Sequence, residues 1–286
     1  MILCVVGPTG VGKTKLSIAL AKHYNAIVVN ADSMQVYKGL NIGTAKVTEE
    51  EKEDIPHFLF DIKNPEEMYT VYDYQKDLRN ILNNNKDKNI VIVGGTGFYI
   101  KAGLYNYMFE EDLNNYNYDN YTNQELYDMA LKKDNDCNIH VNNRKRLIRF
   151  LNKKETKIDK DKLLYNAIFI GLTTDRDNLY KRINERVDIM VQNGLLEEVK
   201  SLYDRNIRSK AIMTGIGYKE LYEYFDKKIS LEDAILLIKS RSRKYAKRQY
   251  TWFNNQMSVK WFNTNFNDFD ETIDNVIKHI EDVMEK

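Results

Sequence analysis

The stretch that decides the fold is ILCVVGPTGVGKT, residues Ile2–Thr14. Its first part, Ile2–Val6, is a short apolar run of the kind that forms a buried strand. Its second part fits G-x-x-x-x-G-K-[ST], the pattern of a phosphate-binding loop. A helical pattern, Lys15–Lys22, follows at once, so the motif lies between a strand and a helix, as such loops do. We therefore predict a site for a ligand that carries at least two linked phosphates.

Each residue type in this loop has a physical role. Glycines let the backbone curl so that its N–H groups point at the ligand, and the helix N-terminus adds partial positive charge. Lys13 supplies a full charge to terminal phosphate oxygens, and the Thr14 hydroxyl can hold Mg²⁺. The predicted diphosphate-binding residues are Gly7, Pro8, Thr9, Gly10, Val11, Gly12, Lys13 and Thr14.

The segments that follow predict an α/β fold. A second apolar strand at Ala26–Val29 completes a strand–helix–strand unit, which implies a parallel sheet flanked by helices, as in P-loop NTPases. Composition changes near Tyr105, so we expect a short helical insertion at 105–165 and a catalytic core formed by 1–104 and 166–286. Further strands are expected at 56–62, 90–93 and 168–172, and helices at 71–82, 124–151, 177–204, 217–225 and 231–253.

Bulk composition excludes several classes of protein. The 286 residues include 43 Lys and Arg against 42 Asp and Glu, so the net charge identifies no partner. The two cysteines form neither a disulfide framework nor a metal site, and we expect Cys4 in the core. No apolar run approaches the roughly 18 residues of a membrane span. We expect a soluble, cytoplasmic monomer with no metal site beyond a phosphate-bound Mg²⁺.

Asp32 is the acidic residue that follows the second predicted strand. Ligands of parallel sheets bind beyond the carboxyl ends of the strands, so Asp32 and Thr96 should face the same crevice as Lys13. The third strand ends in Gly94-Gly95-Thr96 and not in the Mg²⁺-binding acid of an ATP-hydrolysing protein. Asp32 is therefore a candidate Mg²⁺ ligand or general base. A helix or turn cap is the alternative.

A basic helix is predicted near the C-terminus. At about 100° per residue, Arg241, Lys244 and Arg248 share one face, with Tyr245 and Trp252 on an adjacent one. Phosphate contacts from such a helix, with aromatic rings to stack on bases, suit RNA; a solvated surface helix is the alternative. The cations are Lys239, Arg241, Arg243, Lys244, Lys247 and Arg248, with no acid between 239 and 250.

Over most of its length the chain resembles the tRNA dimethylallyltransferase family, the isopentenyl-tRNA transferases. Residues Gly7–Thr14 are similar to the family's G-P-T-x-x-G-K-T. Residues Asp32–Lys46 match its highly specific run D-S-x-Q-[VI]-Y-x-x-[LM]-[DN]-I-G-T-A-K. Supporting matches are Pro56-His57 with Asp61, Val93–Thr96, Ile139–Arg146 with Arg149, Gly217-Tyr218, and Ala246–Gln249 with Thr251-Trp252.

The resemblance implies a reaction and roles for its residues. A dimethylallyl group would pass from dimethylallyl diphosphate to the exocyclic amine of the adenosine at position 37, in the anticodon stem-loop of tRNA. Asp32 would be the general base, and Lys13 with Thr14-bound Mg²⁺ would stabilise the leaving diphosphate. Thr96 would face both the diphosphate and the amine. The implied tRNA-binding residues are Asp32, Ser33, Met34, Gln35, Thr96, Lys244, Lys247 and Arg248.

The chain departs from the family pattern in two places. Thr214 stands where many members carry an Arg or Gln near the diphosphate, which makes Arg176 a candidate source of that charge. The insertion is short, and a Tyr- and Asn-rich stretch, 105–123, replaces its usual start. The alternative functions are a prenyltransferase or ATP-binding kinase that acts on free nucleotides, and a non-catalytic P-loop RNA-binding protein.

Overall fold

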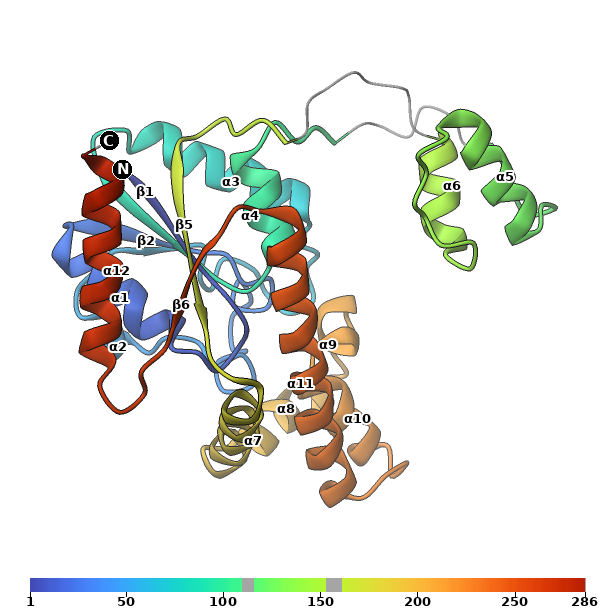
Figure 1. The fold of residues 1–286 in the computed structure, drawn as a ribbon. Coiled ribbons are helices and arrows are strands. Elements are labelled where there is room, and N and C mark those ends of the chain that lie inside the picture. The colour runs from blue at the N-terminus through green and yellow to red at the C-terminus, as the bar shows by residue number, and fades with distance from the viewer. Residues whose placement is uncertain (110–115, 153–160, 286) are drawn as a thin grey trace. The chain divides into compact units, whose positions relative to one another are not determined.

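The computed structural model describes residues 1–109, 116–152 and 161–285 (Figure 1). The chain divides into two compact units, one formed by Met1–Tyr105 with Leu163–Lys286 and the other by Asn106–Lys162. Parts of the expected insertion, 110–115 and 153–160, lie outside the described residues. Within the described ranges, no helix combines the length and the apolar character that crossing a membrane requires.

The larger unit is built on a parallel sheet of six strands within the described ranges, in the order β3-β2-β4-β1-β5-β6. This confirms the predicted α/β class. Because β1 lies between β4 and β5, the loop that follows β1 leaves the sheet near its centre. The strands are β1 Ile2–Val6, β2 Ala26–Asn30, β3 His57–Phe58, β4 Asn89–Val93, β5 Ala167–Thr173 and β6 Lys260–Asn263.

Helices cover both faces of this sheet (Figure 1). Alternate residues of a strand point to opposite faces, so Val5 of β1 packs with α1 and α12 while Cys4 packs with α3 and α4. Cys4 is fully buried, as predicted, and burial raises the pKa of its thiol. The helices of the larger unit are α1 Lys13–His23, α2 Glu49–Lys52, α3 Val71–Asn84, α4 Gly97–Leu104, α7 Arg176–Gln192, α8 Leu195–Asp204, α9 Lys210–Thr214, α10 Tyr218–Phe225, α11 Leu231–Gln256 and α12 Phe269–Met284.

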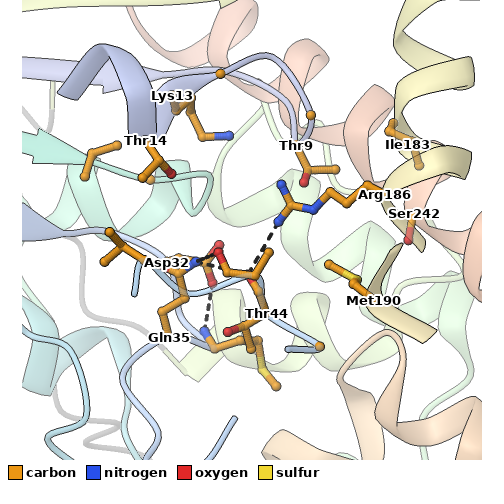
Figure 2. Close-up of a pocket in the computed structure, with 18 of the residues that line it drawn as sticks. Thr9, Lys13, Thr14, Asp32, Gln35, Thr44, Ile183, Arg186, Met190 and Ser242 are labelled. Carbon is orange, nitrogen blue, oxygen red and sulfur yellow. Dashed lines mark hydrogen bonds between the residues drawn. The ribbon is translucent and has the colours of Figure 1, made fainter. Parts of the chain in front are cut away.

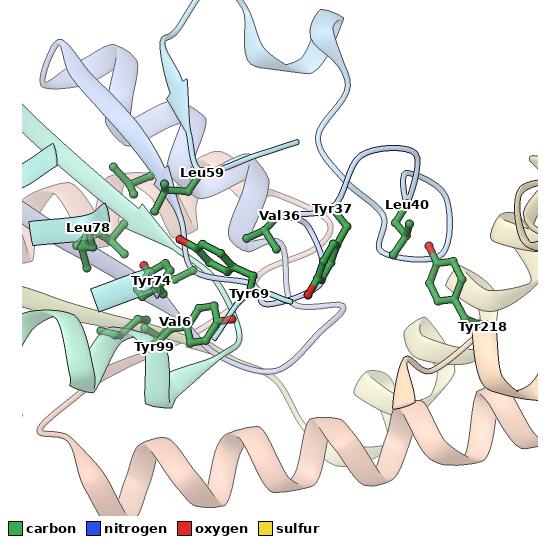
Figure 3. Packing of buried hydrophobic residues seen from close by; sticks show 14 of the residues in the cluster. Val6, Val36, Tyr37, Leu40, Leu59, Tyr69, Tyr74, Leu78, Tyr99 and Tyr218 are labelled. Atoms are coloured by element: carbon green, nitrogen blue, oxygen red, sulfur yellow. The ribbon is translucent and has the colours of Figure 1, made fainter. Parts of the chain in front are cut away.

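The core on the α3 side extends beyond the sheet into the loop that follows β2 (Figure 3). Tyr74 and Tyr99 stack with ring centroids 4.3 Å apart, close to the carboxyl ends of the strands. Val36 and Leu40 of the loop are fully buried in the same cluster. Burial of these side chains fixes the backbone of a segment that has little regular structure of its own.

Two expected helices differ in the structure, and one strand was not expected. The helix expected at 124–151 is two helices, α5 Asn123–Lys133 and α6 Arg144–Asn152, because the Asn- and Asp-rich segment between them favours turns. The helical stretch 177–204 breaks at Gly194, whose φ is 99°. Strand β6 was not predicted; its sequence is only KWFN, and pairing with β5 makes it a strand.

Candidate active site

A cavity of about 1110 Å³ lies beside the phosphate loop, which we define as Gly7–Thr14 (Figure 2). Its wall combines that loop with the loop after β2, with one face of α7, with residues 214–218 and with part of α11. The sequence-predicted residues in the wall are Thr9, Gly10, Gly12, Lys13, Thr14, Asp32, Ser33, Met34, Gln35 and Arg248. Those outside it are Gly7, Pro8, Val11, Thr96, Lys244 and Lys247.

The phosphate loop has the curled backbone that its glycines predict. Gly7, Gly10 and Gly12 have φ values of 136°, 89° and 92°, a region that residues with a side chain rarely adopt. Gly12 also caps the N-terminus of α1, and a Cβ there would lie 2.5 Å from the ring of Phe269. The loop therefore directs the positive end of α1 at the cavity.

Lys13 points into the cavity and is partly deprived of water. Its Nζ donates to the carbonyl oxygen of Pro8 at 2.7 Å. Burial and, to a smaller extent, the nearby guanidinium of Arg186 lower its pKa, the Asp32 carboxylate opposes both effects, and the net pKa is about 7. An anion in the cavity would favour the ammonium form, so Lys13 is poised to gain its charge when a phosphate binds.

The Thr14 hydroxyl lines the same cavity, where Asp32 is the nearby carboxylate (Figure 2). Among the described residues, no three His, Cys, Asp or Glu side chains gather into a metal cluster. One hydroxyl, one carboxylate and the oxygens of a bound diphosphate suit Mg²⁺, which usually keeps several waters and binds through few protein ligands. The residues present therefore fit a magnesium ion held together with its substrate.

Asp32 begins the β2 loop, which we define as residues Asp32–Lys46. Its Oδ1 accepts from the backbone N–H of Met34 at 2.9 Å, so Asp32 does cap a turn. Among the described residues, its other oxygen, Oδ2, accepts no hydrogen bond, although the side chain lines the cavity. One oxygen thus orients the carboxylate while the other remains available, so the cap and the general base are compatible roles.

Thr96 lies behind Ser33, outside the cavity wall. Its hydroxyl oxygen accepts from the Ser33 N–H at 3.0 Å and donates to the Ser33 hydroxyl at 3.3 Å. Its own N–H donates to the carbonyl oxygen of Ala31 at 3.0 Å. In this structure Thr96 fixes the residue next to Asp32, and its predicted contact with the diphosphate stays a prediction.

Two arginines of α7 reach the site, and sequence reasoning missed both. Arg182 Nε donates to the Gly10 carbonyl oxygen at 3.1 Å, and Arg186 Nη2 donates to the Thr44 carbonyl oxygen at 3.5 Å (Figure 2). Burial lowers the pKa of Arg186, and Asp32 opposes this. The predicted candidate, Arg176, is exposed at the start of the helix, outside the wall. The helical spacing of Arg182 and Arg186, which places them on one face, was the available signal.

The cations of α11 divide into two groups. Three are held by other side chains: Lys239 by Asp188 at 2.6 Å, Arg243 by Asn184 at 2.6 Å, and Arg241 by the buried Glu220. The other three, Lys244, Lys247 and Arg248, are exposed, and no ion pair joins them to any acid of the described residues. The charges of the first group are bound within the protein, whereas those of the second are exposed to solvent.

Gln249 joins α11 to both glycine-rich loops. Its Oε1 accepts from the Thr9 N–H at 3.1 Å, and its Nε2 donates to the Gly95 carbonyl oxygen at 3.0 Å. Only 5% of Gln249 is exposed. A Cβ on Gly95 would lie 2.0 Å from Nε2, so a residue with a side chain would not fit at position 95 beside Gln249. The sequence showed Gln249 within a motif but not what it contacts.

Comparison with known proteins identifies the family. A family model described as IPP transferase matches residues 35–256. A tRNA dimethylallyltransferase of Bacillus subtilis is 47% identical, over 91% of this chain and 90% of that protein. The tRNA isopentenylpyrophosphate transferase of Bacillus halodurans matches with a TM-score of 0.78 at 41% identity, over 99% of this chain and 96% of that one. A eukaryotic dimethylallyltransferase acting on tRNA matches with a TM-score of 0.75 at 29% identity, over 92% of this chain and 73% of that one. The chain belongs to the IPP transferase family, the tRNA dimethylallyltransferases.

Proposed function

We propose that the chain transfers a dimethylallyl group from dimethylallyl diphosphate to the exocyclic amine of the adenosine at position 37 of tRNA. One observation carries the proposal: a single cavity places together a phosphate loop, an apolar wall and a carboxylate with one oxygen that accepts no hydrogen bond from the described residues. The apolar residues Ile183, Met190 and Ile216 suit a five-carbon chain. A substrate with a charged head and an apolar tail fits such a lining.

The diphosphate would bind at the phosphate loop. The amides of the loop and the N-terminus of α1 would hold its oxygens, and Lys13 and Arg186 would balance the charge that develops as it leaves. Mg²⁺ would be held by the Thr14 hydroxyl and would supply further positive charge to the leaving group. The proposed reaction needs no hydrolytic water, because the acceptor is an amine.

The amine would react from the side of the β2 loop. Its nitrogen forms a bond to the first carbon of the dimethylallyl group as the bond from that carbon to the diphosphate oxygen breaks. The amine then carries one proton too many, and Asp32 Oδ2 would accept it. Ser33, Met34 and Gln35 line the same wall and would contact the adenine, which must leave its stack to enter.

The exposed cations of α11 would bind the anticodon stem-loop. Lys244, Lys247 and Arg248 have no acidic partner among the described residues, and Arg248 also lines the cavity. Its guanidinium lies 5.7 Å from the ring centre of Tyr245, so a basic surface continues into the site. Such a surface favours a polyanion over a free nucleotide. A tRNA substrate also supports the expected cytoplasmic location.

An assay with labelled dimethylallyl diphosphate tests the proposal. Unmodified tRNA, AMP and buffer alone are offered as acceptors, with and without Mg²⁺, and products are digested to nucleosides. We expect label only on adenosine from tRNA, and only with Mg²⁺. Transfer to AMP but not to tRNA would favour the free-nucleotide enzyme. Binding of tRNA without transfer would favour the non-catalytic RNA-binding protein, and phosphate transfer in a parallel reaction with labelled ATP would favour the kinase.

A further inference from the structure

The carboxylate of Glu198, in the first turn of α8, binds the backbone of the β2 loop. Its Oε2 accepts from the N–H groups of Asn41 at 2.8 Å and Ile42 at 2.7 Å. Its Oε1 accepts from the Gly43 N–H at 3.0 Å and from the Tyr218 hydroxyl at 2.7 Å. Bonds to a charged acceptor are stronger than those between neutral groups. One side chain therefore holds three successive amides, across more than 150 residues of sequence.

The turn at residues 41–43 is also fixed from the side of α10. A Cβ on Gly43 would lie 2.7 Å from the hydroxyl oxygen of Tyr218, so any larger residue would displace the turn or the ring. Tyr218 is 1% exposed and has little room to move. Glu198 itself lies outside the cavity wall, whereas Gly43 and Thr44 are part of it. Any effect of Glu198 on a substrate must therefore pass through the turn or through Tyr218, which also lines the wall.

The next residue connects this turn to Gln35. The carbonyl oxygen of Thr44 accepts from Gln35 Nε2 at 3.0 Å and from Arg186 Nη2 at 3.5 Å (Figure 2). The Ala45 carbonyl oxygen accepts from the same Gln35 Nε2 at 3.4 Å. Within the described residues, the side-chain nitrogen of Gln35 (Nε2) makes no other hydrogen bond. The position of this side chain therefore depends on the carbonyl groups of Thr44 and Ala45.

We infer that Glu198 is a positioning residue for transfer to tRNA: by holding the 41–43 turn it places the Thr44 carbonyl and, through it, the amide of Gln35. The inference deepens the proposed function and rests on it. A misplacement of about 1 Å can lower a rate by about 10²-fold. Glu198→Gln keeps the shape and part of the bonding, so we expect kcat/KM for tRNA to fall about tenfold.

The neighbouring Glu197 provides a matched control, because it is exposed and its substitution by Gln removes the same charge from the same helix. We expect Glu197→Gln to keep the wild-type kcat/KM and both variants to bind inorganic diphosphate within about twofold of wild type. In a Gln35→Ala background, Glu198→Gln should have less than about a twofold effect, because the side chain it places is gone. Full additivity of the two substitutions, or a wild-type rate for Glu198→Gln, would overturn the inference.

A second variant tests the turn itself, and a spectroscopic measurement makes the test independent of turnover. Gly43→Ala displaces the same turn while Glu198 itself is kept, and it should reproduce the fall in kcat/KM for tRNA. The side-chain amide resonance of Gln35, assigned by its loss in Gln35→Ala, should shift in Glu198→Gln and not in Glu197→Gln. An unshifted resonance contradicts the inference even if the protein proves to have another activity. A shifted resonance in a protein without prenyl transfer would sink only the proposed function.

Discussion

The phosphate loop and the β2 loop line the same cavity, yet different parts of the chain shape them. The phosphate loop is largely local, since its curl comes from its own glycines and from the start of α1. The β2 loop depends on distant side chains: Glu198 holds its turn and Thr96 holds Ser33. A motif alone can therefore locate the phosphate site, whereas the β2 loop needs the folded chain. In the proposed reaction the phosphate loop binds dimethylallyl diphosphate and the β2 loop contacts the adenine of tRNA. A variant in one loop should therefore affect mainly the substrate that this loop binds.

The largest effect is expected for Asp32→Asn, on the β2 loop. Asparagine keeps an oxygen for the Met34 N–H but cannot accept the proton of the amine, so kcat should fall by about 10²- to 10⁴-fold. Without Mg²⁺, affinity for inorganic diphosphate should not fall, because a negative charge leaves the cavity. Single-turnover rates and diphosphate binding by calorimetry measure the two effects. Unchanged turnover would mean that Asp32 only caps the turn.

The second largest effect is expected for the exposed cations of α11, and it concerns the affinity for tRNA alone. Replacing Lys244, Lys247 and Arg248 by Gln should weaken tRNA affinity by about 10- to 100-fold and reduce the slope of log affinity against log salt by about 2 to 3. The KM for dimethylallyl diphosphate should stay the same. The matched control neutralises three exposed lysines elsewhere on the larger unit, Lys86, Lys88 and Lys278. If both triple variants lose the same affinity, the effect comes from total charge and α11 is not the binding surface.

A smaller effect, on the diphosphate alone, is expected for Gln249→Ala. The substitution removes the one side-chain contact from α11 that holds the Thr9 amide of the phosphate loop, among the described residues. The two lost bonds are worth about 1 kcal/mol each, so affinity for dimethylallyl diphosphate should fall by about 10- to 30-fold. Gln256 on the same helix is exposed and is the control. A loss of tRNA affinity instead would show that Gln249 supports α11 and not the loop.

The sequence predicted the parts of the site that depend on neighbouring residues. Strand β1, the phosphate loop and Asp32 at the end of β2 follow from hydrophobic runs and residue spacing, which act over a few positions. Thr96 was expected to face the cavity because it follows β4, but a strand end fixes only the edge of the sheet and not the direction of each side chain. Its hydroxyl bonds Ser33.

The missed residues depend on contacts between distant segments. Arg186 and Arg176 have the same chemistry and lie on the same helix, and only the packing of α7 decides that Arg186 enters the cavity. The cations of α11 show the same limit. Lys239 and Lys244 are the same residue type on the same helix. Only Lys239 forms an ion pair, because Asp188 of α7 lies beside it. Spacing along one helix cannot reveal which acids the facing helix presents.

The smallest predicted effect tests the local character of the phosphate loop through pH. The pKa of Lys13 in the free protein is about 7, well below its ordinary value of 10.5, so Lys13 loses its charge as the pH rises through 7. A bound diphosphate stabilises the ammonium, so binding above pH 7 must take up a proton. Through Lys13, affinity for inorganic diphosphate should therefore fall about twofold from pH 6 to 7 and about fivefold from pH 7 to 8.

Calorimetry in buffers of different ionisation enthalpy measures this proton uptake directly. Lys13→Arg should remove most of the pH dependence, because a guanidinium stays charged throughout the range. The affinity for tRNA should follow a different pH profile, since Lys13 belongs to the phosphate loop and not to α11. Equal uptake in wild type and Lys13→Arg would assign the proton to another group. A tRNA affinity that followed the same curve would mean that the two loops do not act on separate substrates.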